Sequence, residues 1–152
     1  MDAKKISDST TIAAPADVVF AIVADPRQHA RIDGSGSVQG LVEGPERLSQ
    51  GAEFGVSMKL FGLSYKIGNR VVEFEEDRRI AWRHFAGHRW RYEIEPVADG
   101  GTVVTETFDY SRYGPLASLV ISAFGFPERN RRGIAGTLTR LKEAAESDAK
   151  AA

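Results

Sequence analysis

The chain has 152 residues, of which 42% are hydrophobic and 27% are charged, with no cysteine and a formal net charge of −1. This length is typical of one domain with a sizeable core, so we expect a single domain over 1–152 with its core at about 6–145. The lack of cysteine excludes disulfides, thiolate nucleophiles and cysteine-ligated zinc. The near-zero charge argues against broad nucleic-acid binding, and no segment has the apolar length of a signal peptide or a membrane span. We therefore expect a cytoplasmic protein with no nucleic-acid partner and no membrane insertion.

The first third of the chain predicts one strand and two short helices. Polar and apolar residues alternate over 5–12, as expected for a strand with one buried face. Pro15 suits the first turn of a helix, and the apolar residues of 16–24 fall on one side of that helix. Pro26 ends it, because the residue before a proline avoids the helical region. A second short helix is expected over 27–31.

The middle of the chain predicts strands, and the end predicts helix. Apolar residues recur at helical spacing over 116–124 and again over 134–145, and Pro127 should kink or restart the helix between them. Six segments between turn signals have the composition of strands: 38–42, 54–60, 65–75, 80–84, 88–97 and 103–110.

Short loops between these strands predict which side chains share one face of the sheet. Three-residue loops fit at 76–78, 85–87 and 99–101. All three place the same set on one face: Val72, Phe74, Ile80, Trp82, Trp90, Tyr92, Ile94, Val104, Phe108 and Tyr110, joined by His84, His88 and Glu106.

The same loops predict cross-strand partners. They pair Val72 with Trp82, Trp82 with Trp90, and Ile94 with Glu106. A tight turn after Gly62 would instead point Asn69 inward, which puts it out of phase with Val72. We expect a β-bulge at about 69–71 to reconcile the two phases and bend the sheet.

An aromatic wall with a few polar groups is typical of a ligand pocket. The alternative is that these side chains fill the core themselves and only their polar ends reach solvent. Composition does not decide between a pocket and a filled core. The ligand-binding candidates are Phe54, Met58, Trp82, His84, Trp90, Tyr92, Glu106, Phe108, Tyr110, Phe124 and Phe126.

Several short motifs carry a resemblance to a known family: Ser9 to Pro15 with Val18 to Phe20, Asp25-Pro26, Val71 to Glu75 with Arg79 to Trp82, and Trp90 to Tyr92 through Pro96 with Gly101-Thr102. Through them the chain resembles the SRPBCC superfamily, the START and Bet v1-like proteins, in its bacterial polyketide cyclase/dehydrase-like branch. The resemblance implies an α+β helix-grip fold, with a curved antiparallel sheet of about seven strands wrapped on a long C-terminal helix and two short helices after the first strand. It also implies a deep cavity between sheet and helix, but no particular reaction.

Glu106 is the most notable ionisable group on the apolar face. In an apolar cavity its pKa would be raised, and Glu106, Tyr92 or His84 could then assist proton transfer. The more ordinary interpretation, which we favour, places Glu106 at an open rim or in an ion pair with an arginine of the C-terminal helix such as Arg129.

The remaining polar motifs have ordinary explanations that we prefer. His84 and His88 face each other and could hold a metal, but polar residues at a cavity mouth explain them better, so we expect no metal and no cofactor. Asp33 is typical of turn chemistry. The arginines of 129–132 fit a solvated helix face, and Gly133 and Gly136 would let the helix approach the sheet closely or flex as a gate.

We therefore expect a protein that binds a hydrophobic or aromatic small molecule, such as a lipid or a polyketide-like compound. The second hypothesis is a cyclase or aromatase-type enzyme. The third is a protein-interaction module or homodimer with a filled core. No nucleophile, base and orienting group are visible as a set, so binding ranks above catalysis.

Overall fold

The computed structural model describes residues 5–35, 38–60, 62–83, 88–111, 114, 116 and 126–151. Within them, seven strands form one antiparallel sheet in the order β1-β7-β6-β5-β4-β3-β2. The strands are β1 (Lys5–Ile12), β2 (Val38–Glu43), β3 (Glu53–Leu60), β4 (Leu63–Glu75), β5 (Arg79–Arg83), β6 (Arg89–Pro96) and β7 (Thr102–Asp109). The helices are α1 (Ala16–Val23), α2 (His29–Ile32) after a 3-10 turn (Pro26–Gln28), and α4 (Phe126–Ala151).

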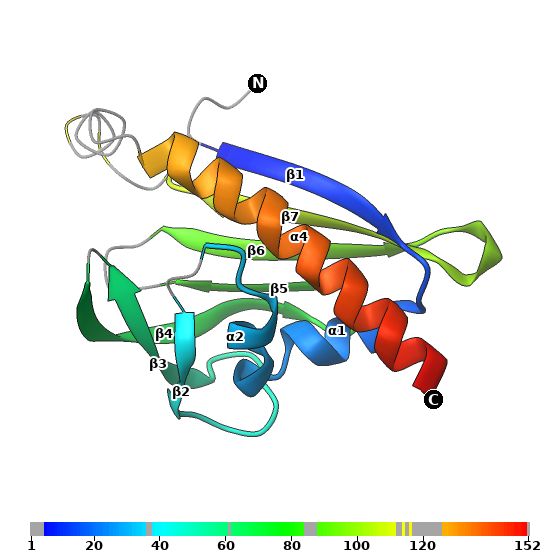
Figure 1. The fold of residues 1–152 in the computed structure, drawn as a ribbon, viewed down its shortest axis with the longest axis horizontal. Coiled ribbons are helices and arrows are strands. Elements are labelled where there is room, and N and C mark those ends of the chain that lie inside the picture. Colours follow the sequence, from blue (N-terminus) through cyan, green and yellow to red (C-terminus); the bar gives the residue numbers. More distant parts are fainter. Residues whose placement is uncertain are drawn as a thin grey trace.

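Helix α4 crosses one face of the sheet, and α1 and α2 lie beside it (Figure 1). Its buried side includes Ile134, Leu138, Leu141 and Ala145, the stripe predicted from helical spacing. Pro127 is the second residue of α4, where a missing N–H costs little. The predicted α+β helix-grip fold, with two short helices after the first strand, is confirmed.

The predicted inward face of β5 and β6 is correct. Trp82 lies opposite Trp90, and Ile80 lies opposite Tyr92, as the loop at 85–87 requires. The prediction that His84 pairs with His88 falls on residue 84, which is outside the described residues.

The predicted partners on β6 and β7 are wrong by two residues. Glu106 lies opposite Tyr92 rather than Ile94, and Ile94 lies opposite Val104. The connection is longer than a three-residue loop because Val97 N–H donates to the carbonyl of Gly101 around a short 3-10 turn. A shift by two keeps every side chain on its predicted face, since the strand period is two.

The bulge on β4 is present, one residue beyond the predicted range. The register shifts between Val71 and Glu73, so Val71 rather than Val72 lies opposite Trp82. Val71 is buried, while Val72 is only half-buried. The bulge lets Asn69 and Val71 point to the core together with Phe74, which an unbroken strand could not do.

The outer face of the sheet is charged. Glu73 on β4 accepts hydrogen bonds from Arg89 and Arg91 on β6, at 2.7 and 2.8 Å. These bonds pass over Ala81 of β5, which lies opposite both Glu73 and Arg91. The two arginines hold the pKa of Glu73 down at about 2. A site for an apolar ligand is therefore expected on the inner face of the sheet.

Candidate functional site

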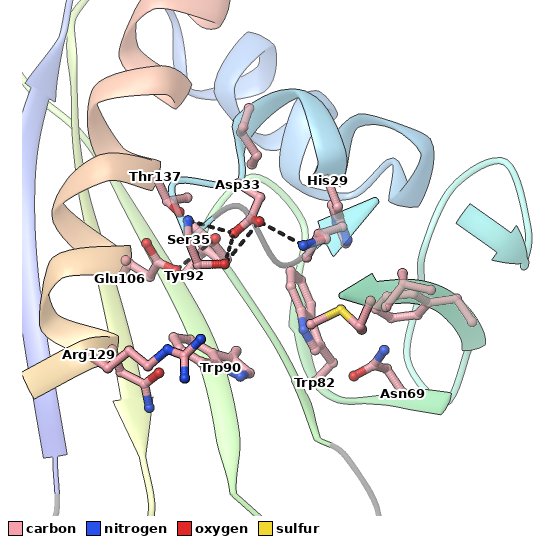
Figure 2. Close-up of a pocket in the computed structure, with 17 residues that line it drawn as sticks. His29, Asp33, Ser35, Asn69, Trp82, Trp90, Tyr92, Glu106, Arg129 and Thr137 are labelled. Carbon is pink, nitrogen blue, oxygen red and sulfur yellow. Dashed lines mark hydrogen bonds between the residues drawn. The ribbon is translucent and has the colours of Figure 1, made fainter. Parts of the chain in front are cut away.

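A cavity of about 230 Å³ lies between the inner face of the sheet and helices α2 and α4. Figure 2 shows the sheet on one side of it and the loop after α2 on another. Six of the residues predicted to bind a ligand line this space: Phe54, Met58, Trp82, Trp90, Tyr92 and Glu106. Side chains therefore do not fill the space completely.

Trp82 on β5 is at the centre of the aromatic wall. Its ring stacks on that of His29, with centroids 4.7 Å apart and an interplanar angle of 20°. Phe54 packs edge-on against it at 5.6 Å, and Tyr92 lies at the same centroid distance. Such contacts fix the ring orientations, so the wall is preorganised.

Tyr92 and Glu106 form a buried hydrogen-bonded pair. The Tyr92 hydroxyl donates to Glu106 Oε1 at 2.9 Å, and only 3% of Glu106 is exposed. Burial raises the pKa of Glu106 to about 8, and burial together with the nearby Glu106 raises the pKa of Tyr92 well above its usual value. The expectation of a rim carboxylate or an Arg129 ion pair is wrong, because the true register places Glu106 directly beside Tyr92 in the core.

Within the described part of the chain, two buried oxygens at this cavity have no hydrogen-bond partner. They are Glu106 Oε2 and Asn69 Oδ1, and both residues line the space. An unsatisfied buried polar group costs about 1–3 kcal/mol. A molecule in the cavity that bonded to these atoms would recover part of that cost.

His29 on α2 lines the cavity as a neutral side chain. Its Nε2 lies 2.9 Å from the carbonyl oxygen of Val23. Because a carbonyl only accepts, Nε2 must carry the hydrogen. Burial lowers the pKa of His29, which keeps the ring uncharged.

The loop after α2 closes one side of the cavity. The carboxylate of Asp33 accepts hydrogen bonds from Ser35 Oγ at 2.7 Å and from the backbone N–H of Val38 at 2.8 Å. Gly34 N–H donates to Thr137 Oγ1 of α4 at 2.9 Å. Asp33 thus shapes its own turn, as expected, and also lines the cavity.

Glycines allow this loop to touch α4. A Cβ on Gly136 would lie 3.1 Å from Gly34 Cα, tighter than ordinary contacts. A Cβ on Gly133 would lie 3.5 Å from Ser35 Cβ, an ordinary distance. The glycines of α4 therefore allow close approach of the loop after α2, and not of the sheet as expected.

The other predicted ligand contacts lie elsewhere. Phe108 and Tyr110 are buried but are not among the described residues that line the cavity. Phe108 packs on Trp90 at 4.7 Å and on Tyr110 at 5.4 Å, so both extend the core beyond Trp90. The side chains of His84, Phe124 and Phe126 lie outside what the structure describes.

Helix α4 supplies the remaining wall. Arg129 lines the cavity and lies next to Trp90 in Figure 2. Its neighbours Arg131 and Arg132 form ion pairs with Glu128 on the exposed side of the helix, as expected for a solvated face. In the described part of the chain, no three histidine or acidic side chains come together as a metal site.

No helix among the described residues is long and apolar enough to cross a membrane. The family model described as polyketide cyclase/dehydrase and lipid transport matches residues 3–146. The chain belongs to this family. The SRPBCC-type resemblance inferred from the sequence motifs is thereby confirmed.

Two mycobacterial relatives are similar to this member of the polyketide cyclase/dehydrase and lipid transport family. The uncharacterized protein Rv0088 of Mycobacterium tuberculosis H37Rv is 43% identical over 141 residues, which cover 91% of this chain and 63% of the relative. The uncharacterized protein MT0096 of strain CDC 1551 matches to the same extent. The chain thus spans 63% of the length of both relatives.

Solved structures share the fold of this family member. Protein NE0264 from Nitrosomonas europaea superposes with a TM-score of 0.72 at 19% identity, covering 100% of both chains. The AHSA1-like protein from Aeromonas hydrophila has a TM-score of 0.64 at 21% identity, covering 95% of this chain and 93% of that one. At such identities the similarity shows the fold alone.

Among the cavity residues of this family member that were not predicted as ligand contacts are His29 and Asn69. Asn69 had a signal, because the turn after Gly62 already pointed it inward. His29 had none, because its position depends on how α2 packs over Trp82, a contact between residues far apart in sequence. The sequence of a short helical segment does not predict which distant residue it will contact.

Proposed function

We propose that the chain binds one small, mostly apolar ring molecule in the cavity between the sheet and α4. The observation that carries this proposal is a space of about 230 Å³ walled by preorganised aromatic rings and left open between them. The family description, polyketide cyclase/dehydrase and lipid transport, is consistent with a hydrophobic ligand.

The cavity volume sets the size of the ligand. A dry apolar cavity of about 150 Å³ accepts benzene. A space of about 230 Å³ therefore suits a molecule of one or two rings. Rings also fit the flat faces of Trp82 and Trp90, against which they can stack.

Native mass spectrometry of the protein purified from its own source tests this function. We expect a co-purifying molecule of one or two rings at one per chain. Val56→Phe should lose it, because Val56 is a buried residue of the cavity wall and a larger side chain there takes up the space. Ser57→Phe is the matched control, since the next residue of a strand points to the other face. A ligand retained by Val56→Phe would place binding elsewhere.

The Tyr92–Glu106 pair favours a second candidate function, proton transfer on the bound molecule. A carboxyl group with a pKa of about 8 is protonated at neutral pH and can act as a general acid. Glu106→Gln, which retains a hydrogen-bonding group of the same size, should then abolish turnover of the molecule found by mass spectrometry. Unchanged turnover would remove Glu106 from the mechanism.

A further inference from the structure

Glu106 and Asn69 lie at opposite ends of the same cavity wall. Glu106 is on β7 and Asn69 is on β4, with the tryptophan-bearing strands β5 and β6 between them. Three interstrand spacings separate the two strands by about 14 Å. Asn69 also lies about four residues further along the sheet than Glu106, because its neighbour Arg70 is level with Arg83, Arg89 and Asp109. Figure 2 shows Glu106 and Asn69 on opposite sides of the space, with Trp90 and Trp82 between them.

Each end offers one buried atom that has no hydrogen-bond partner among the residues that the structure describes. Glu106 is 3% exposed and Asn69 is 5% exposed. Glu106 Oε1 accepts the hydrogen bond of the Tyr92 hydroxyl, while no described residue bonds to Glu106 Oε2 or to Asn69 Oδ1. Buried polar groups without partners are rare in folded proteins and call for an explanation.

We infer that Glu106 and Asn69 determine specificity by binding two hydroxyl groups at opposite ends of a flat two-ring ligand. The inference rests on the proposed function and specifies the polar ends of the ligand. The rings would occupy the space against Trp82 and Trp90, and one hydroxyl would meet Glu106 Oε2 while the other meets the Asn69 amide.

A hydroxyl is the group that both ends can recognise. It donates one hydrogen bond and accepts others. It can therefore bond to Glu106 whether the carboxyl group is protonated or ionised. The Asn69 amide likewise offers an acceptor and two donors, so a hydroxyl fits either face of it.

Calorimetric titration with three probes tests this inference: naphthalene, 2-naphthol and 2,6-dihydroxynaphthalene. A hydrogen bond contributes about 0.5–1.5 kcal/mol net, so each hydroxyl should tighten binding by roughly 2- to 12-fold. Asn69→Leu should remove the gain from the second hydroxyl, leaving the dihydroxy probe no tighter than 2-naphthol. The affinity for naphthalene should not fall.

Three further variants make the test specific. Replacing the pair together, Tyr92→Phe with Glu106→Leu, should remove the gain at the other end without leaving a hydroxyl unpaired. Ser57→Ala, on the opposite face of β3, should preserve the order of the three probes. Asn69→Ser is the second variant at Asn69 if leucine prevents folding, and it should reduce the gain from the second hydroxyl.

The outcomes separate the two proposals. Naphthalene binding as tightly as the dihydroxy probe, as expected if water already satisfies both groups, would overturn two-ended recognition and leave the proposed function standing. The same holds if Asn69→Leu weakens all three probes equally. Failure of all three probes to bind the folded protein would overturn both.

Discussion

Glu106 combines deep burial, a hydrogen bond from Tyr92 and one unpartnered oxygen. Its face of the sheet could be predicted from the sequence because side-chain direction depends only on the parity of the register. Its partner could not, because the loop before β7 is two residues longer than the turn that its glycines favour. That difference moves Tyr92 opposite Glu106 and creates the buried pair.

Glu106→Gln should change how the free energy of unfolding depends on pH. Folding raises the pKa of Glu106 from 4.5 to about 8. In that interval the folded protein keeps a proton that the unfolded chain has released, so the stabilisation present below pH 4.5 is lost as pH rises toward about 8. Relative to the variant, the wild type should lose on the order of 4–5 kcal/mol over this window.

Urea unfolding of both proteins across that pH window is the measurement. Comparing the two proteins cancels the titration of the other groups. Parallel pH profiles would contradict a neutral, buried carboxyl group at Glu106. The glutamine variant retains an acceptor for the Tyr92 hydroxyl, so it should remain folded.

At the scale of elements, the contact between α4 and the loop after α2 closes one side of the cavity. It depends on Gly34 lying against Gly136, and on the hydrogen bond from Gly34 to Thr137. The glycines of α4 predicted a close approach to the sheet, and this was wrong, because the loop after α2 lies against them instead. Loops that pack against helices leave no periodic pattern in the sequence, whereas strand faces and helix stripes do.

Gly136→Ala should therefore open this contact, while Gly133→Ala should not. The new methyl group of Gly136→Ala would lie 3.1 Å from Gly34 Cα and 3.2 Å from its carbonyl oxygen, so the loop must move. At Gly133 the methyl group would meet Ser35 at 3.5 Å, and alanine in a helix is favoured over glycine by about 1 kcal/mol.

Thermal unfolding and amide hydrogen exchange of the two variants check this contrast. We expect Gly133→Ala to raise the melting temperature. We expect Gly136→Ala to lower it and to speed exchange at the Gly34 N–H, which bonds to Thr137. Equal stabilisation by both substitutions would contradict a close loop–helix contact at Gly136.

At the scale of the whole molecule, the fold follows from features that are visible in the sequence. Alternating strands, a pair of short helices and a long amphipathic helix predict the layers, and family motifs predict their arrangement. The cavity is less visible, because it is the space that these layers leave between them. Its volume depends on the bulge in β4, on the stacking of His29 on Trp82 and on how α4 packs against the sheet. Each of these features involves residues far apart in the sequence.

The central claim, that a ring molecule binds in this cavity, is tested most directly by NMR of the tryptophan indoles. The chain has two tryptophans, and both line the cavity. Titration with naphthalene should shift both indole N–H signals together and saturate at one molecule per chain, because ring currents act only on nearby nuclei. The claim would be contradicted if naphthalene did not bind, or if it bound without shifting either indole signal.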